Sequence, residues 1–374
     1  MAMGVDRQSY LHGIDILVQI HQPVILWGAP GIGKTSHFEQ LAELLGVPIE
    51  TVIASLHDPT DFSGLPFIEN GYANYAPPNW AIRLKESERG GILFLDEIGT
   101  APPATQAALL RVVLERQVGQ TYLGDDVSVV AAANPPEQGA GGWELTLPLA
   151  NRFFHVDWTM DAETWIEGMQ TNWARSIVKL PADWDKNLAE EMIRMTGFIR
   201  RFPQHLLSVP KEDTAKAWPS PRSWTMGLRA LTAAAAAGAH EDVQYLLLQW
   251  AVGVGPALEY KKWKRDLDIP TPQEVLRNPK SVKIPHKPDQ LFTLVSSVAW
   301  YVGENLNQTS WDAGWAFMAR LAEAEGAADI GAIGARQLDR ASKTADNKPK
   351  MALKAPHEHL GAFRSMLRTA GKSV

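Results

Sequence analysis

The sequence predicts an α/β core followed by an all-helical part, and three observations support this fold class. Up to about residue 157, short β-branched or apolar runs alternate with amphipathic stretches, which is typical of a parallel sheet with helices on both faces. The first of these runs leads through a glycine-rich turn directly into a helix-like segment. After about residue 160 the strand-like runs stop, and only helical periodicity follows.

Five apolar runs are expected to form the strands of the sheet. They span residues 22–27, 48–54, 91–95, 127–133 and 153–157. The third and fourth are almost continuously apolar, as expected of central parallel strands that are buried on both faces. Helices are expected at 10–20, 36–45 and 103–116. Within residues 58–78, the pair Asn70-Gly71 predicts a hairpin turn, because both residue types accept the left-handed backbone that tight hairpins need.

The C-terminal half is predicted to be helical. Helical patterns cover residues 188–202, 223–236, 242–252, 290–306, 311–324 and 359–370. Residues 261–289 are rich in Pro, Lys and Arg, which favours a linker or exposed arm, and the polar stretch 341–350 is typical of a loop. We therefore expect an α/β core (1–160), an α-helical lid (161–258), a basic proline-rich linker (259–289) and a helical C-terminal region (290–374).

Composition excludes several classes of protein. Of the 374 residues, 45% are apolar and 21% are charged, which is ordinary for a globular protein with two or three domains. Because no cysteine is present, disulfides and thiolate metal sites are excluded. The formal net charge of −6 argues against a protein that coats nucleic acid. No segment has the pattern of a signal peptide or of a membrane span, so a cytoplasmic location without a membrane partner is expected.

The segment Gly28-Ala29-Pro30-Gly31-Ile32-Gly33-Lys34-Thr35 fits the pattern G-x-x-x-x-G-K-[ST] between a predicted strand and a predicted helix. Such a phosphate-binding loop wraps backbone N–H groups around phosphate oxygens, and the helix N-terminus adds a partial positive charge. Lys34 is expected to reach the β- and γ-phosphates of a nucleotide, and the Thr35 hydroxyl to ligate Mg²⁺. The residues expected to bind the nucleotide are Gly28, Ala29, Pro30, Gly31, Ile32, Gly33, Lys34, Thr35 and Ser36. The motif predicts a P-loop NTPase core.

Two further strand ends carry polar side chains that suit nucleotide chemistry. Four apolar residues precede Asp96 and Glu97; Asp96 is expected to hold Mg²⁺ and Glu97 to act as general base for the attacking water. Asn134 ends the next strand, where its amide is expected to orient that water or to touch the γ-phosphate, since the carboxyl ends of parallel strands line the ligand crevice. The alternatives are an exposed acidic turn and a turn-forming Asn134 before Pro135-Pro136.

Together these motifs resemble the AAA+ ATPases, and specifically their MoxR-type branch. The resemblance rests on residues 28–35, 92–97, 130–136, 139–145, 148–153 and 219–224, in this order along the chain. It covers about residues 10–235, whereas residues 260–374 match no family that we can name. It implies ATP and Mg²⁺ as cofactors, ATP hydrolysis, and a P-loop core followed by a helical lid.

The resemblance also implies roles for single residues. Asn134 falls on the family's sensor-1 position. Arg152, within Asn151-Arg152-Phe153, falls on the arginine-finger position, from which the family reaches the γ-phosphate bound by a neighbouring subunit; many relatives have Asp where this chain has Asn151. Arg222 falls on the sensor-2 position at the start of a lid helix, where it would contact the nucleotide of its own chain. The alternative for each arginine is an ordinary surface charge.

The resemblance implies a homohexameric ring that remodels a protein client, with a von Willebrand factor A domain protein as an inferred partner. If Arg152 acts on the neighbouring subunit, one chain has an incomplete site and a closed ring completes every site. The candidate client contacts are Phe62, Leu65 and Tyr72, and the alternative is that they pack within their own loop. Residues 139–142 are a candidate hinge or a plain connector.

Two other functions would use the same core. A nucleic-acid-stimulated motor would need a basic pore or arm, and residues 261–287 are the candidate. Within them, Lys261-Lys262-Trp263-Lys264-Arg265 interleaves an aromatic residue with cations, although a solvated helix end is the simpler interpretation. The net charge argues against nucleic acid as a partner. A chelatase-like subunit that drives metal insertion is the remaining alternative.

Overall fold

The computed structural model describes residues 6–135, 143–210 and 216–343, and the chain divides into two compact units. Unit 1 comprises Met1–Lys186 and Gln204–Leu258, and unit 2 comprises Asn187–Pro203 and Glu259–Val374. Each unit has an apolar core of its own. The two units are therefore described one after the other.

Unit 1 is built on a five-stranded sheet in which all neighbouring strands run parallel. The strands are β1 (Val24–Trp27), β2 (Ile49–Ile53), β5 (Gly91–Asp96), β8 (Val127–Ala133) and β9 (Phe154–Asp157), in the spatial order β2-β5-β8-β1-β9. All five predicted strands are confirmed. The register places Trp27 beside Ala133 and Asp157, so the carboxyl ends of these strands lie at one edge of the sheet.

Helices cover both faces of this sheet, because alternate residues of a buried strand point to opposite sides. The bounds of these helices are α1 (Arg7–Gln19), α2 (Lys34–Leu45), α3 (Pro59–Ser63), α4 (Asn79–Lys85) and α5 (Pro103–Glu115). On one face, Leu93 and Leu95 of β5 share a core with α3, α4 and α5. On the other face, Phe94 packs against Phe38 of α2 with ring centres 5.4 Å apart, and α1 lies against β1 and β8. The predicted α/β fold is confirmed.

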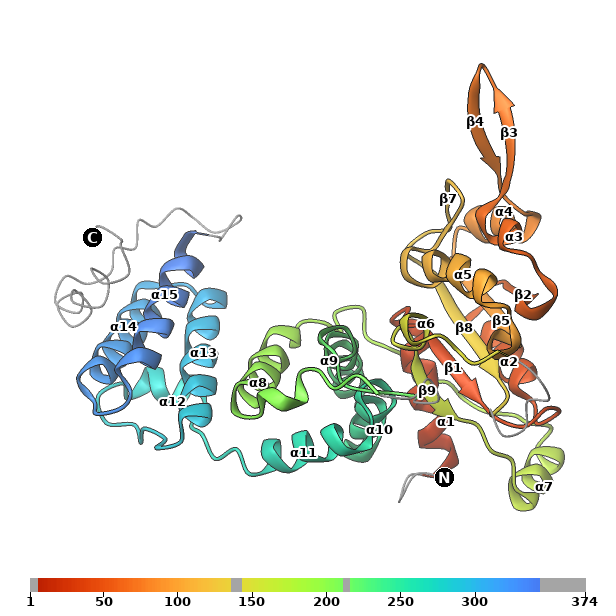
Figure 1. Cartoon of the computed structure of the whole chain (residues 1–374). Coiled ribbons are helices and arrows are strands. Elements are labelled where there is room, and N and C mark those ends of the chain that lie inside the picture. The colour runs from red at the N-terminus through yellow and green to blue at the C-terminus, as the bar shows by residue number, and fades with distance from the viewer. Residues whose placement is uncertain (1–5, 136–142, 211–215, 344–374) are drawn as a thin grey trace. The chain divides into compact units, whose positions relative to one another are not determined.

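A hairpin of β3 (Leu65–Glu69) and β4 (Tyr72–Ala76) projects from unit 1 (Figure 1). Its turn is Asn70-Gly71, as predicted, and both residues have positive φ angles of 51° and 81°, which match the right-handed twist of the two strands. A second, shorter hairpin pairs β6 (Gln117–Val118) with β7 (Thr121–Tyr122). Two short helices, α6 (Leu147–Ala150) and α7 (Ala162–Gln170), flank β9.

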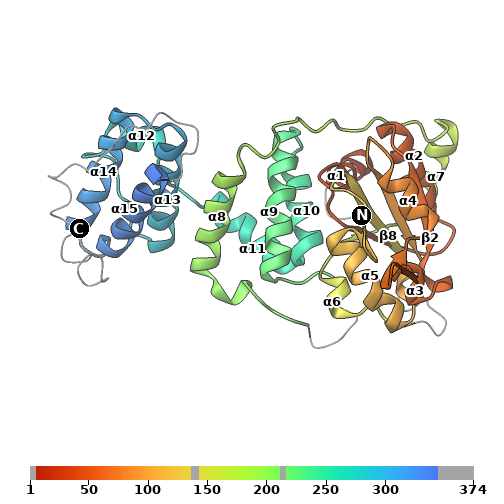
Figure 2. The same ribbon diagram turned by 90° about the horizontal axis from the view of Figure 1, so that it is seen from above.

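Unit 1 ends in helices, as predicted for the part that follows the sheet. α9 (Pro221–Ala236) and α10 (Glu241–Val252) pack side by side (Figure 2), and α11 (Val254–Arg265) begins directly after them. α9 begins with a capping box, in which Ser220 and Ser223 bond each other's backbone N–H groups. α10 also packs against α1, which ties these helices to the sheet.

Unit 2 is a bundle of helices around its own core. It contains α8 (Leu188–Arg201), the end of α11, α12 (Pro272–Arg277), α13 (Pro288–Glu304), α14 (Gln308–Glu323) and α15 (Ala328–Lys343). Buried aromatic and aliphatic side chains such as Trp311, Phe317 and Leu338 fill the space between α13, α14 and α15. The helices predicted at 188–202, 290–306 and 311–324 are therefore present.

Unit 2 differs from the expected division of the chain in two places. α8, which the sequence placed in the lid, packs against α13. Residues 259–289, expected as a linker, contain the end of α11 and all of α12, because Thr271 and Glu274 form a capping box that starts a helix within this proline-rich stretch. α15 extends to Lys343, while the remainder of the expected loop and the predicted helix 359–370 lie outside the described residues. None of the described helices has the length and apolar content needed to cross a membrane.

Candidate functional site

The glycine-rich loop lies at the carboxyl edge of the sheet. Gly28 follows β1 and its N–H donates to the Ala133 carbonyl of β8 at 3.1 Å. Gly31 and Gly33 have φ angles of 78° and 81°, which only glycine adopts without strain. Gly33 is the N-cap of α2 and supplies no side-chain hydrogen bond. The first N–H groups of α2 therefore remain available to an anion, and the helix dipole favours one there.

Lys34 connects this loop to Asn134. The ammonium Nζ donates to the carbonyls of Gly28 (2.6 Å) and Ala29 (3.0 Å) and to Asn134 Oδ1 (3.1 Å). Burial lowers the pKa of Lys34, and the negative charges of Asp96 and Glu97 oppose this shift. The structure thus brings Lys34 and Asn134 into direct contact and sets both acidic residues within electrostatic range of the ammonium.

The two acidic residues at the end of β5 have different surroundings. Asp96 is half-buried, and its Oδ1 accepts from the Glu97 N–H at 2.9 Å. Glu97 is exposed, has a φ of 54° and accepts a 2.6 Å hydrogen bond at Oε2 from the Ser55 hydroxyl. Sequence reasoning missed Ser55. The available signal was its place just after β2, the strand that pairs with β5, which puts both strand ends at the same edge.

The oxygen donors near this edge suit a Mg²⁺ ion. Thr35 lies half-buried in the first turn of α2, Ser36 is exposed beside it, and Asp96 ends the neighbouring part of the sheet. Mg²⁺ prefers carboxylate, hydroxyl, phosphate and water oxygens. Among the described residues, no group of three or more His, Cys, Asp and Glu could hold a metal by itself. Thr35 and Asp96 therefore fit an ion that is shared with phosphate oxygens.

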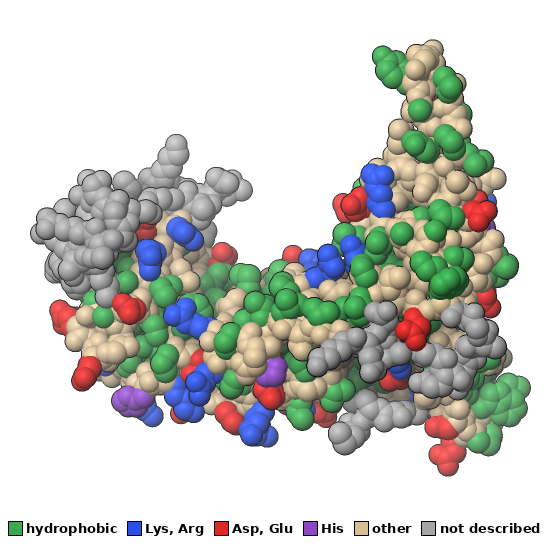
Figure 3. Space-filling model, in the orientation of Figure 1, with side chains coloured by type: hydrophobic (Ala, Val, Ile, Leu, Met, Phe, Trp, Pro, Cys, Tyr) green, Lys and Arg blue, Asp and Glu red, His purple; other side chains and the backbone are tan. Residues whose placement is uncertain are grey.

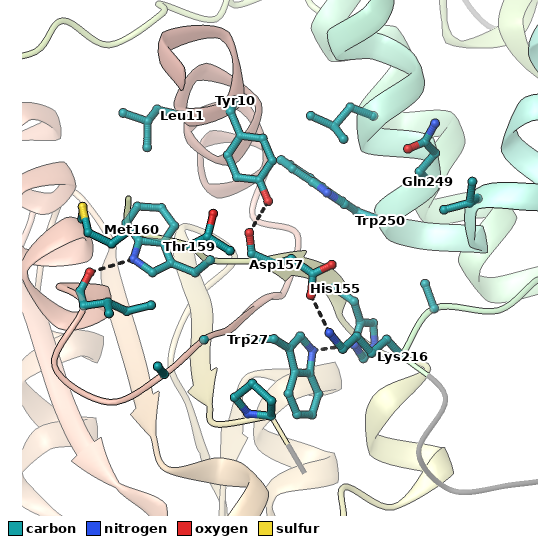
Figure 4. A pocket seen from close by; sticks show the side chains of 18 of the residues that line it. Tyr10, Leu11, Trp27, His155, Asp157, Thr159, Met160, Lys216, Gln249 and Trp250 are labelled. Carbon is teal, nitrogen blue, oxygen red and sulfur yellow. Dashed lines mark hydrogen bonds and ion pairs between the residues drawn. The ribbon is translucent and has the colours of Figure 1, made fainter. Parts of the chain in front are cut away.

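A cavity of about 850 Å³ lies directly beside the glycine-rich loop (Figure 4). Its walls come from α1, the loop, the segment after β9, and α10. The residues that line it include Arg7, Tyr10, Leu11, Trp27, Gly28, Ala29, Ile32, His155, Asp157, Trp158, Thr159, Met160, Lys216, Gln249 and Trp250. The glycine-rich loop thus also borders an aromatic-lined space of small-molecule size.

Trp158 holds the loop from the side of this cavity. Its indole Nε1 donates to the Ile32 carbonyl at 3.0 Å, and its ring packs against His37 of α2 with centres 4.7 Å apart. A Cβ on Gly28 would lie 2.4 Å from the Trp158 carbonyl oxygen, so only glycine allows this close approach. The shape of the loop therefore depends on Trp158 as well as on its own glycines.

A chain of polar contacts forms another wall of the cavity (Figure 4). Lys216 forms an ion pair with Asp157, and its Nζ lies 5.6 Å from the ring centre of Trp27. The Trp27 Nε1 donates to His155 Nδ1 at 2.9 Å, and the other ring nitrogen of His155 lies 2.9 Å from the Ala150 carbonyl. Burial lowers the pKa of His155 to about 4, so this imidazole is neutral at pH 7 and links Trp27 to the neighbouring backbone.

Helices α1 and α10 close the cavity. The Tyr10 hydroxyl donates to the Asp157 carbonyl at 2.6 Å, and the Tyr10 ring meets Trp250 edge-on at 5.0 Å. Sequence reasoning missed Tyr10, Trp27, Trp158 and Trp250 as a group. They are far apart in the chain and belong to no short motif, so no local pattern could have found them.

Arg152 and Arg222 lie within electrostatic range of each other. Arg152 follows α6, and its Nη1 donates to the Pro148 carbonyl. Burial is the main cause that lowers the pKa of Arg152, and the positive charge of Arg222 contributes. Asn151 accepts a 2.9 Å hydrogen bond from Ser220 at the start of α9, which joins the two segments. Within the described part of the chain, neither guanidinium forms a hydrogen bond or ion pair with the residues around Lys34.

The predicted client contacts have different environments. Phe62 is only 2% exposed and packs near Trp80, so it belongs to the core of unit 1. Leu65 and Tyr72 are 64% and 75% exposed on the β3–β4 hairpin. The candidate hinge at 139–142 lies outside the described residues. Of the three predicted contacts, only the two on the hairpin are open to a partner.

Comparison with known proteins supports the resemblance of the α/β core to an AAA+ ATPase. Residues 23–153 match the family described as the AAA domain of the dynein-related subfamily. An uncharacterized protein of Staphylococcus epidermidis is 27% identical over 40% of this chain and 60% of its own length, and one of Staphylococcus aureus is 29% identical over 38% and 58%. The chain thus matches about three fifths of the length of these relatives.

Two solved structures are distantly similar. A candidate ATPase from Cytophaga hutchinsonii is 16% identical with a TM-score of 0.45, covering 70% of this chain and 89% of its own. A full-length MCM homolog from Methanopyrus kandleri is 17% identical with a TM-score of 0.38, covering 65% and 54%. Both are too distant to add to the family match. The match of residues 23–153 to the AAA domain supports an AAA+ ATPase core in this chain.

Proposed function

We propose that this chain binds Mg²⁺-ATP, hydrolyses it at interfaces between its own copies and remodels a protein client, as an AAA+ ATPase of the MoxR type. The observation that carries the proposal is the cluster at the carboxyl edge of the sheet. There Lys34 contacts Asn134 and the loop carbonyls, and Asp96 and Glu97 lie within electrostatic range. This arrangement combines a phosphate-binding loop, an acidic Mg²⁺ ligand and a candidate base in one place.

Each residue of the cluster has a defined task in this proposal. The N–H groups of the loop and the Lys34 ammonium hold the β- and γ-phosphates, and Thr35 and Asp96 hold the metal. Bound Mg²⁺ would neutralise phosphate charge. Glu97 accepts a proton from the attacking water, and the Asn134 amide orients that water. In the structure the Ser55 hydroxyl occupies one carboxylate oxygen of Glu97 and the other remains available to a water.

The cavity beside the loop is the proposed site for the base and ribose. Its volume of about 850 Å³ lies within the usual range for small-molecule sites. Gly28, Ala29 and Ile32 belong both to the phosphate-binding loop and to the cavity wall. A nucleotide with its phosphates on the loop would therefore extend directly into a space lined by Trp27 and Trp158.

Replacing Trp158 by Phe tests whether this side chain shapes the loop. The variant keeps an aromatic ring but leaves the Ile32 carbonyl without its indole donor. We expect ATP to bind about 2- to 10-fold more weakly, the range that one net hydrogen bond supplies. Calorimetric titration with a non-hydrolysable ATP analogue measures this, with Trp165→Phe on the exposed face of α7 as control. Equal affinity for Trp158→Phe and the unmodified chain would show that the indole does not position the loop.

The position of Arg152 supports hydrolysis between copies. Its guanidinium donates to the Pro148 carbonyl, and among the described residues it forms no hydrogen bond or ion pair with the residues around Lys34, so Arg152 does not serve as the finger arginine of its own loop in this structure. A neighbouring copy in a ring would supply it, and we propose a homohexamer on the strength of the MoxR resemblance. Such an arginine stabilises the charge that develops on the transferred phosphoryl group.

The dependence of ATPase activity on protein concentration tests hydrolysis between copies. We expect phosphate release per chain to rise with concentration, because each site is completed only when two chains meet. The measurement pairs steady-state phosphate release with light scattering over the same concentrations. Constant activity per chain from a protein that stays monomeric throughout would overturn the interface model.

The β3–β4 hairpin is the proposed contact with the protein client. Its apolar side chains Leu65, Phe67, Ile68, Tyr72 and Tyr75 are between 42% and 82% exposed. Figure 3 shows hydrophobic side chains along the projecting hairpin. Exposed apolar side chains at such density indicate a binding surface. We propose that this surface engages the client, with a von Willebrand factor A domain protein as a candidate partner of the ring.

A further inference from the structure

Positive and negative side chains are distributed unequally between the two units of this chain. Among the residues that the structure describes, unit 2 contains 15 Lys and Arg against 13 Asp and Glu, whereas unit 1 contains 14 against 24. The described part of unit 1 is therefore strongly acidic, with a formal charge of −10, whereas the described part of unit 2 carries a formal charge of +2. An argument from net charge against polyanionic partners applies to unit 1 and does not apply to unit 2.

Internal contacts occupy much of the first basic stretch of unit 2, residues 261–265. The Lys264 ammonium lies 2.8 and 2.9 Å from the carboxylate oxygens of Glu191. Arg265 faces its neighbour Asp266 at 3.4 Å, and the Trp263 indole donates to Asp289 at 2.8 Å. Because the Trp263 indole and the Lys264 ammonium bond internal carboxylates, this stretch does not combine a free aromatic ring with a full set of free cations.

The second basic stretch has a different environment. No acidic residue occurs between Glu274 and Asp289, and a basic side chain stands at every third position from 277 to 286. The members of this stretch are Arg277, Lys280, Lys283, His286 and Lys287, and all five are exposed. In the described part of the chain, no carboxylate lies within ion-pair distance of any of them. We call residues 277–287 the basic loop.

The basic loop is held in one shape by the rest of unit 2. Arg320 of α14 donates from Nη1 to the carbonyls of Pro279 (3.2 Å) and Val282 (2.8 Å). Val282 and Ile284 pack against the apolar core, while Lys283 between them faces solvent. Three prolines, at 279, 285 and 288, restrict the backbone further. A ligand therefore meets cations whose backbone is already ordered, which lowers the entropic cost of binding.

We propose that the basic loop binds the phosphate backbone of a nucleic acid. Repeated cations without intervening carboxylates complement a chain of regularly spaced phosphates, and neutralising them releases condensed counterions. Such binding carries little sequence preference, because contacts to phosphate do not read bases. An anionic lipid surface fits less well, since it also requires exposed apolar side chains that insert, and Val282 and Ile284 are turned to the core. The inference is independent of the proposed ATPase function.

The test compares the full chain with the triple variant Lys280→Ala/Lys283→Ala/Lys287→Ala. Fluorescence anisotropy with a labelled 30-nucleotide single-stranded DNA, a 30-base-pair duplex and a 30-nucleotide RNA is measured without ATP at several salt concentrations. For single strands, the loss of three phosphate contacts is expected to make the slope of log K, where K is the association constant, against log salt concentration shallower by about 2. This change corresponds to about 100-fold weaker binding at 0.1 M salt. The matched control is Lys85→Ala/Lys179→Ala/Lys186→Ala, which removes the same charge from exposed lysines of unit 1.

The outcomes separate the proposal from its alternatives. Loss of affinity and slope in the triple variant, with the control unchanged and both variants folded by circular dichroism, supports it. Equal binding by the triple variant and the unmodified chain overturns it, as does the absence of binding to all three nucleic acids at low salt. The proposal is also overturned if the chain binds only to vesicles that contain phosphatidylserine, which would assign the loop to a lipid surface. It is overturned as well if light scattering shows a loop-dependent self-association without nucleic-acid binding, which would assign the loop to a second copy of the chain.

Discussion

Replacing Glu97 by Gln is expected to slow ATP turnover by about 10²- to 10⁴-fold, the contribution of a positioned general base. The amide has almost the shape of the carboxylate but cannot take a proton from the attacking water. ATP binding is expected to persist, because Lys34 contacts the loop carbonyls and Asn134 and not Glu97. The Ser55 hydroxyl can still donate to the amide oxygen, so the local hydrogen bond is retained.

Two measurements on the same preparation check this expectation. Phosphate release gives turnover, and calorimetric titration with ATP gives affinity. The matched control is Glu88→Gln, an exposed glutamate outside the cluster, which should behave like the unmodified chain. Rapid turnover by Glu97→Gln would remove Glu97 from the role of base, and a joint loss of turnover and binding would assign it a structural role instead.

Replacing Arg152 by Ala is expected to reduce turnover by about 10³- to 10⁵-fold, the range of an arginine finger in related nucleotide hydrolases. In this structure the guanidinium donates to the Pro148 carbonyl and, among the described residues, forms no hydrogen bond with the glycine-rich loop. If Arg152 serves a neighbouring copy, it completes the active site of that copy and not the site of its own chain. The loss should therefore be repaired by a partner chain that keeps Arg152.

Mixing two inactive variants provides that partner. In an equal mixture of Arg152→Ala and Glu97→Gln chains, about a quarter of randomly formed head-to-tail interfaces pair an intact Glu97 site with an intact Arg152. We expect phosphate release to recover toward about a quarter of the unmodified rate, since each such interface is complete. Arg89→Ala, an exposed arginine, is the control for charge removal. Two inactive variants that stay inactive when mixed would contradict action between copies, provided that both still associate by light scattering.

Local features of unit 1 could be predicted because they depend on neighbouring residues. The central strands are nearly continuous apolar runs, since both of their faces are covered. Asn70-Gly71 predicted its hairpin because both residues adopt positive φ there. The spacing of Gly28, Gly33 and Lys34 predicted the tight glycine-rich turn from β1 into α2, because this short segment carries its own backbone requirements.

Features that depend on distant contacts could not be predicted in this way. α8 has ordinary helical periodicity, which shows that it is a helix but not that its partner is α13, about a hundred residues later in the chain. The stretch 261–289 is polar and rich in proline, and this composition indicated a linker. The short helix that begins at the capping box of Thr271 was therefore not predicted. Tyr10, Trp158 and Trp250 line one cavity only after α1, β9 and α10 have packed together.

The sequence by itself determined the α/β class, the five strands and the glycine-rich turn between β1 and α2, because periodicity and turn chemistry act within a few residues. Only the tertiary structure decided that Lys34 contacts Asn134 and that Ser55 holds Glu97, since these pairs are separated by 100 and 42 residues. It also decided which cations of unit 2 are used internally and which face solvent. Such pairings follow from how strands and helices stack, and no local stretch of sequence encodes them.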